Sequence, residues 1–96
     1  MNIKEHLLTV LAEECSEVQL AVSKTLRFGA DDGRPGSDVT NAQDIEKEFI
    51  EAMAVRDMLK ELGVLSNLDD TRAIYDNKRK RVEHYMEYAK SKGTLK

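Results

Sequence analysis

An unbroken helical repeat at the start of the chain is the feature that most constrains the fold. From Asn2 to about Leu26 the apolar residues recur at intervals of three and four positions, and nothing breaks the pattern. This spacing is typical of an amphipathic α-helix, and an asparagine at its start is suited to cap the first turn. The sequence therefore predicts a long first helix over residues 3–26.

Three glutamates lie in the most apolar part of this helix. At roughly 100° per residue, Glu14 falls inside the apolar arc, Glu17 falls at its edge and Glu13 points well away from its centre. Removing an isolated carboxylate from water costs many kcal/mol. A glutamate on a buried face must therefore be protonated, paired with a cation or bound to a metal ion.

A polar loop and a second helix follow. Residues 28–39 hold two turn-type clusters, D-D-G and R-P-G, and predict the one long loop of the chain. Thr40 or Asn41 then precedes an apolar repeat that ends before a glycine. This pattern predicts a second helix over 41–62, with one of those two residues as its N-cap.

The third helix completes an all-α fold. Its apolar repeat predicts a helix over 69–91 capped by Asn67 or Asp69, and no alternating pattern indicates a strand. A length of 96 residues favours a single domain over 1–96. Three amphipathic helices cannot easily shield a wide apolar stripe on each of them, whereas a four-helix bundle can. We therefore expect antiparallel helices around a four-helix-bundle-like core that is completed by oligomerisation, as a homodimer or homotetramer.

The charge of the chain argues against two kinds of partner. The net charge is −3 at pH 7 and the isoelectric point is about 5.4, so no general basic field attracts nucleic acid or an anionic membrane. The basic run over 78–81 is followed by Glu83 and Glu87, which weakens a nucleic-acid interpretation of that run. We expect neither nucleic acid nor membrane as a partner.

The sequence also bears on the compartment. No apolar run approaches the roughly 20 residues of a membrane span, and the start of the chain lacks the long apolar core of a signal peptide. The single cysteine, Cys15, excludes an internal disulfide and lies near the apolar edge of the first helix, where a buried thiol is expected. We expect a cytoplasmic protein, or one acting in the host cytoplasm for a phage-encoded chain.

The second helix carries misplaced glutamates of its own. Glu48 falls near the middle of the apolar arc and Glu51 lies on the same side, with the i, i+3 spacing that also relates Glu14 to Glu17. Such pairs are neighbours on a helix surface, so two helices packed side by side would bring four carboxylates together. Oxygen ligands without histidine or thiol favour Mg²⁺ or Mn²⁺ over Zn²⁺.

Two other interpretations of these glutamates remain open. Glutamate-rich helices are common, and a single E-x-x-E is most often a solvated face. Alternatively, Glu14 or Glu48 forms a buried ion pair with one of three cations, namely Arg56, Lys78 or Arg81.

Cations accompany the apolar arcs as well. Lys78 and Arg81 lie on the arc of the third helix, and Lys24 lies two turns beyond Glu17 along nearly the same line. Cations in such positions neutralise a carboxylate cluster, or bind the phosphates of a ligand that metal ions also hold. The two roles are compatible.

With both carboxylate pairs in view, the chain resembles the all-α nucleoside triphosphate pyrophosphohydrolases of the MazG-like superfamily, in particular its small phage and bacterial members. The family signature is E-E-x-x-E on one helix and E-x-x-D on the next. The first half stands here as Glu13-Glu14-x-x-Glu17 and the second as Glu48-Phe49-Ile50-Glu51, with glutamate in place of aspartate. The resemblance covers roughly residues 5–90.

The resemblance implies a metal-dependent hydrolase. Water would attack the α-phosphorus of a nucleoside triphosphate and release pyrophosphate from a nucleoside monophosphate, with Mg²⁺ as cofactor or Mn²⁺ in its place. One glutamate, Glu13 or Glu17, would orient or deprotonate that water. The implied metal ligands are Glu14, Glu17, Glu48 and Glu51. The implied phosphate-binding or nucleotide-binding residues are Lys24, Lys78, Arg81 and Phe28.

Two alternatives come from other classes. A di-iron bundle needs Glu-x-x-His pairs that face inward, and neither histidine stands three positions after a candidate glutamate. A non-catalytic helical module that binds nucleotide or another protein is the stronger alternative, because Glu51 departs from the family signature.

Overall fold

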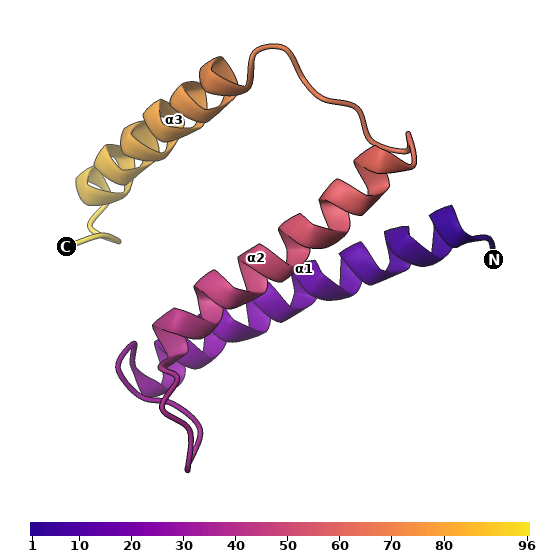
Figure 1. The fold of residues 1–96 in the computed structure, drawn as a ribbon. Coiled ribbons are helices and arrows are strands. Elements are labelled where there is room, and N and C mark those ends of the chain that lie inside the picture. The colour runs from indigo at the N-terminus through magenta and orange to yellow at the C-terminus, as the bar shows by residue number, and fades with distance from the viewer. The chain divides into compact units, whose positions relative to one another are not determined.

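The computed structural model describes all residues of the chain, 1–96. The chain folds into three helices. They are α1 (Ile3–Phe28), α2 (Asn41–Glu61) and α3 (Thr71–Ser91), and the chain has no strand (Figure 1). The predicted all-α class is confirmed. The chain divides into two compact units, Met1–Ser66 and Asn67–Lys96, so that α1 and α2 share the first unit and α3 belongs to the second.

Helix α1 begins with a reciprocal cap. The backbone N–H of Glu5 donates to Asn2 Oδ1 at 2.8 Å, and the backbone N–H of Asn2 donates to Glu5 Oε2 at 3.0 Å. Both donors would otherwise lack partners at the helix start. The helix ends at Phe28, beyond the expected residue 26, because Gly29 adopts a φ of 100° while its N–H still bonds to Thr25.

Helix α2 has the same kind of start. Thr40 is its N-cap, one of the two predicted residues, and its Oγ1 accepts a hydrogen bond from the backbone N–H of Gln43 at 3.1 Å. Gln43 Oε1 in turn accepts from the backbone N–H of Thr40 at 2.9 Å. These bonds fix where the loop ends and α2 begins.

The first unit is an antiparallel hairpin of α1 and α2, which lie side by side along most of their length (Figure 1). Its buried apolar centre is small, since only two apolar residues are buried, Ala21 at 6% exposure and Leu59 at 0%. Around them lie half-buried apolar residues of the predicted arcs: Leu7, Val10, Leu11, Val18, Ile45, Ala52 and Val55.

Other apolar residues of the predicted arcs remain exposed. Those on α1 are Ile3 and Val22. Those on α2 are Phe49, Met58 and Leu62 at its end. Two helices give each other one contact strip, which is narrower than the apolar arc that periodicity assigns to each helix. Cys15 is also exposed, so the expectation of a buried thiol was wrong.

The connection between α1 and α2 is tied down at its base. The side chain of Asn41 is 6% exposed, and its Nδ2 donates to the carbonyl of Gly29 at 2.9 Å. The backbone N–H of Asn41 donates to Asp32 at 2.6 Å, and that of Ala42 donates to Ala30 at 3.1 Å. Hydrogen bonds from the first two residues of α2 thus fix the start of the loop that follows α1.

The second unit consists of α3 and its flanking segments. The helix begins at Thr71, after Asp70, and no side chain caps it, so the prediction of a start at residue 69 with Asn67 or Asp69 as cap was wrong. At the other end, the backbone N–H groups of Thr94 and Leu95 donate to the carbonyl of Ala89 at 3.0 and 3.3 Å. Neither α3 nor the other two helices combine the length and the apolar character needed to cross a membrane.

Candidate functional site

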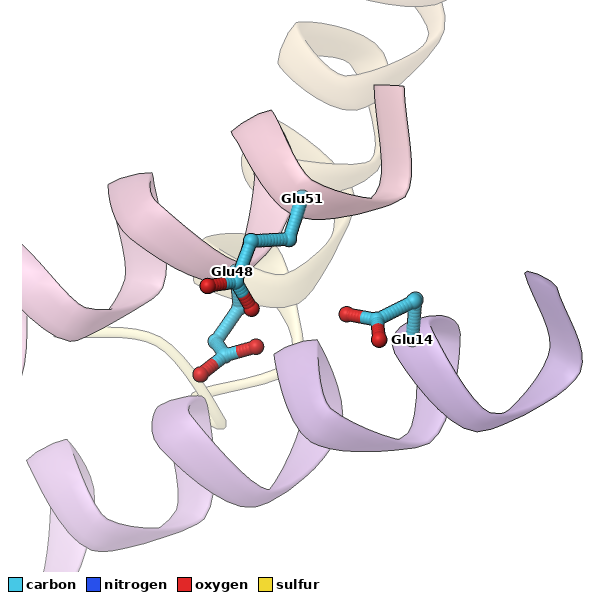
Figure 2. Close-up of side chains that lie close together, drawn as sticks. All are labelled: Glu14, Glu48 and Glu51. Atoms are coloured by element: carbon cyan, nitrogen blue, oxygen red, sulfur yellow. The ribbon is translucent and has the colours of Figure 1, made fainter. Parts of the chain in front are cut away.

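Three glutamates from the two hairpin helices meet between them. Figure 2 shows Glu14 on α1 facing Glu48 and Glu51 on α2. One carboxylate oxygen from each of the three lies within 4.8 Å of the others. The sequence predicted that these residues face a common side, and the hairpin brings them together.

Glu14 has an oxygen without a partner. Its Oε2 is buried and accepts no hydrogen bond. Buried carboxylate oxygens in folded proteins are almost always hydrogen-bonded or bound to a cation, because their loss of hydration is otherwise uncompensated. This oxygen therefore marks a position that a bound cation would satisfy.

The ion pairs of the hairpin leave this cluster nearly unneutralised. Arg56, one of the cations considered as a partner of Glu14 or Glu48, instead contacts Asp57 at 3.3 Å. Glu51 has the only pair within the cluster, with Lys47 Nζ at 3.8 Å from its Oε1, and both side chains are about half exposed (56% and 46%). Exposed pairs of this kind contribute little free energy, so Lys47 does not prevent Glu51 from binding a metal.

The electrostatics of Glu48 reflect its neighbours. The pKa of Glu48 is raised above its ordinary value of 4.5, first by partial loss of water, then by the hydrogen bond that its protonated form makes with Glu51, and then by the negative charge of Glu51. Lys47 lowers this pKa and Glu17 raises it slightly. A divalent cation would reverse the balance by favouring the ionised carboxylates.

The remaining residues of the signature lie at different distances from this cluster. Glu17 is outside the group of three, but it lines a small cavity together with Glu48 and its charge acts on that residue. Glu13 is exposed, and its backbone carbonyl accepts a hydrogen bond from Ser16 Oγ at 2.6 Å. The hairpin therefore does not bring Glu13 into the cluster.

Two cavities adjoin one another at the loop end of the hairpin. The smaller, about 170 Å³, includes Glu17, Lys24 and Glu48 in its lining. The larger, about 360 Å³, includes Lys24 and Phe28, both of which the resemblance implies as nucleotide-binding residues. Lys24 thus lies between the carboxylates and the loop cavity.

Sequence reasoning missed two residues at this place. Arg34 lines both cavities, and Asn41 lines the larger one while holding the loop. Arg34 lies in a turn cluster where no periodicity indicates a direction, but it is the one cation between residues 28 and 39. That isolated positive charge was the one sequence feature that could have indicated an anion-binding residue in the loop.

Lys78 and Arg81 belong to the second unit. Both line a cavity of about 570 Å³ there, together with Val82, Tyr85, Met86 and Leu95 among others. Cationic and apolar side chains thus share one face of α3, as the predicted arc requires.

The donor set of the cluster suits a hard cation. All three groups are carboxylates, and the cluster contains no histidine or cysteine. Oxygen-only sites of this kind hold Mg²⁺, Mn²⁺ or Ca²⁺ in preference to Zn²⁺. The fold and the site therefore define an all-α protein with a carboxylate cluster between two antiparallel helices.

Comparison with models of protein families, with curated proteins and with solved structures found no match to this chain.

Proposed function

We propose that the chain is a Mg²⁺-dependent pyrophosphohydrolase that converts a ribo- or deoxynucleoside triphosphate to the monophosphate and pyrophosphate, in the cytoplasm. The observation that carries this proposal is the convergence of Glu14, Glu48 and Glu51 within 4.8 Å, with a buried Glu14 oxygen that has no partner. The E-E-x-x-E and E-x-x-E spacing, which resembles that of the MazG-like superfamily, supports the choice of reaction.

Glu14, Glu48 and Glu51 are the residues that would hold the metal. Their hard oxygen atoms fit Mg²⁺, and Mn²⁺ has the same ligand preference. When bound, the metal supplies Lewis-acid stabilisation of the negative charge that develops on the phosphate oxygens and makes water more acidic. Glu51 carries one more methylene than the aspartate of the family signature, and Lys47 already contacts it.

The other residues divide the remaining tasks. Glu17, beside Glu48 in the small cavity, accepts a proton from the attacking water. The water oxygen bonds to the α-phosphorus, the bond from that phosphorus to the bridging oxygen breaks, and pyrophosphate leaves with that oxygen. Lys24 binds phosphate from the same cavity. The resemblance implies that Lys78 and Arg81 of a neighbouring subunit would neutralise the pyrophosphate. Glu13 is the weaker candidate for the base because it lies outside the cluster.

The exposed apolar residues of the hairpin support association between copies. Leu20, Phe49, Ile50 and Met58 are each at least 45% exposed, and burying them against another copy would be favourable. Two hairpins supply four helices, which is the number that encloses a bundle core. We take the working form to be a homodimer or a homotetramer, in which these side chains are buried.

The same exposed surface favours a second candidate function, a non-catalytic module that binds nucleotide or another protein. That alternative also agrees with the substitution of Glu51 for aspartate. It predicts partner or nucleotide binding without turnover.

One experiment separates the two functions. A panel of ribo- and deoxynucleoside triphosphates is incubated with the protein and Mg²⁺, Mn²⁺ or EDTA, and pyrophosphate, orthophosphate and the nucleotide product are measured. Metal-dependent release of pyrophosphate with nucleoside monophosphate supports the proposed reaction, provided that Glu14→Gln abolishes it. No release across the panel favours the binding module.

A further inference from the structure

Two cations meet where the small cavity and the loop cavity adjoin. Lys24 near the end of α1 and Arg34 in the loop each line both cavities. Neither forms a salt bridge, whereas Lys47, which also lines the small cavity, is paired with Glu51. Carboxylates line the smaller cavity as well, namely Glu17, Asp44 and Glu48. The larger cavity has Lys24 and Arg34 against a single carboxylate, Asp32, so its lining has a net positive charge and offers a binding position for an anion.

The larger cavity offers a different kind of surface. The aromatic ring of Phe28 and the apolar ring of Pro35 contribute to its lining, and an aromatic face favours contact with a planar ring. The guanidinium of Arg27 lies 4.7 Å from the centroid of the Phe28 ring. This contact helps to hold the ring in place, and Arg27 itself does not line the cavity. The cavity volume of about 360 Å³ lies in the range of ligand sites.

Hydrogen bonds and a close backbone approach restrain the loop that carries Arg34. The side chain of Asn41 donates a hydrogen bond to the carbonyl of Gly29, and its backbone N–H donates to the carbonyl of Asp32. Within the loop, the backbone N–H of Ser37 donates to the carbonyl of Arg34 at 3.0 Å. Gly33 packs so closely on the backbone carbonyl of Val39 that an added Cβ would collide with it. A loop held in this way loses little conformational freedom when a ligand is bound.

We propose that Arg34 and Lys24 bind the phosphate next to the nucleoside, and that the loop cavity beside Phe28 and Pro35 receives the base. This assignment rests on the proposed function for the identity of the ligand as a nucleotide. It gives the nucleotide a direction, with the base toward the loop and the remaining phosphates toward Glu48 in the small cavity. Arg34 has no counterpart in the residues that the family signature supplies, so the role belongs to this chain's own loop.

The test uses nucleoside monophosphates in EDTA, because a monophosphate fills the phosphate position and the base cavity without needing the metal. Isothermal titration calorimetry is performed with adenosine, guanosine, cytidine and uridine monophosphates and with ribose 5-phosphate. The wild type is compared with Arg34→Gln, with Phe28→Leu, and with Arg56→Gln as a matched control. Arg56 lies on α2 in the same unit and lines neither cavity.

We expect Arg34→Gln to weaken binding of the preferred monophosphate about tenfold or more, since a charge-assisted contact to phosphate is lost, while Arg56→Gln binds as the wild type does. Phe28→Leu and removal of the base, as in ribose 5-phosphate, should each weaken binding as well. The side chain of Arg34 makes no hydrogen bond or salt bridge in the chain, so its substitution should leave the melting temperature unchanged.

The assignment is overturned if no monophosphate binds the wild type, if Arg34→Gln binds normally, or if ribose 5-phosphate binds as tightly as the nucleotides. Its failure is distinguishable from failure of the proposed function. Metal-dependent pyrophosphate release that Arg34→Gln leaves intact rejects the role of Arg34 and keeps the reaction. Monophosphate binding that depends on Arg34 without any turnover rejects the reaction and keeps the nucleotide site.

Discussion

A carboxylate oxygen of Glu14 on α1 and one of Glu48 on α2 lie within 4.8 Å of each other, with a third from Glu51 equally close. Like charges at this separation repel one another, and the repulsion is greater where water is excluded. In the metal-free protein this repulsion, together with partial loss of water, raises the pKa of Glu48. The consequences can be measured without knowledge of the substrate.

The first prediction concerns pH. Because the pKa of Glu48 is higher in the folded state than its ordinary value of 4.5, the folded chain retains this proton over a pH window in which the unfolded chain has lost it. The stability associated with this proton is fully present below pH 4.5 and is lost as pH rises through the raised pKa. In EDTA, Glu48→Gln should therefore be more stable than the wild type at pH 7, and this difference should diminish toward acid pH.

Urea denaturation between pH 4 and pH 8, monitored by circular dichroism, measures this effect. Glu46→Gln is the matched control, because Glu46 is exposed and lies outside the cluster. If both variants gained the same free energy of unfolding at pH 7, the cause would be the lower net charge of the protein and not the glutamate cluster.

The second prediction concerns metal binding. A cation that binds only the folded state stabilises it by about 2.7 kcal/mol when its free concentration is one hundred times its dissociation constant. We expect Mg²⁺ and Mn²⁺ to raise the melting temperature of the wild type. Glu14→Gln and Glu48→Gln should remove this increase, and Glu13→Gln should retain it because Glu13 lies outside the cluster. Thermal melts with metal and with EDTA measure this increase. If Glu14→Gln responded to metal as the wild type does, the proposed metal site would be rejected.

The third prediction separates Glu17 from the metal ligands. Glu17 lines the small cavity with Glu48 but is not one of the three clustered glutamates. If it acts as the base, Glu17→Gln should lower kcat about a hundredfold or more and leave the Mg²⁺-induced rise in melting temperature in place. Loss of both properties would instead make Glu17 a metal ligand.

The fourth prediction concerns the loop. Asn41→Ala removes the hydrogen bond to the carbonyl of Gly29 and leaves that acceptor without its partner. The expected cost is about 1–3 kcal/mol of the free energy of unfolding. Asn77→Ala, at an exposed position on α3, is the control and should change stability little. The two values come from urea denaturation, and equal values for the two variants would argue against the loop tie.

The fifth prediction concerns association. Light scattering at micromolar concentration should give a mass that is a multiple of the 10.9 kDa chain. Met58 is 47% exposed on α2, and Met58→Lys should shift the protein toward monomer because a charge would have to be buried in the shared core. Glu46→Lys, which places a lysine at an exposed position of the same helix, should not. A monomeric wild type would reject the oligomer.

Local features of the chain determined the helices and the side of each helix on which the glutamates lie. The Asn2 and Thr40 caps act through neighbouring backbone groups, so they can be recognised without a fold. Periodicity also placed Glu14 and Glu48 on the apolar sides of their helices, because the angle between residues of one helix is constant. It failed at the start of α3, where no side chain forms the expected cap.

The tertiary structure decided which of those side chains meet. Periodicity describes one helix at a time, so it could not separate Glu51, which joins the cluster, from Glu17, which lies beside it. It also could not determine how much of each apolar arc a single neighbour covers, which is why Met58 and Cys15 are exposed. Arg34 and Lys24 line the same two cavities, and this placement depends on the path of the loop that Asn41 joins to Gly29 and Asp32. Such contacts depend on packing between distant segments, and no local pattern in the sequence encodes them.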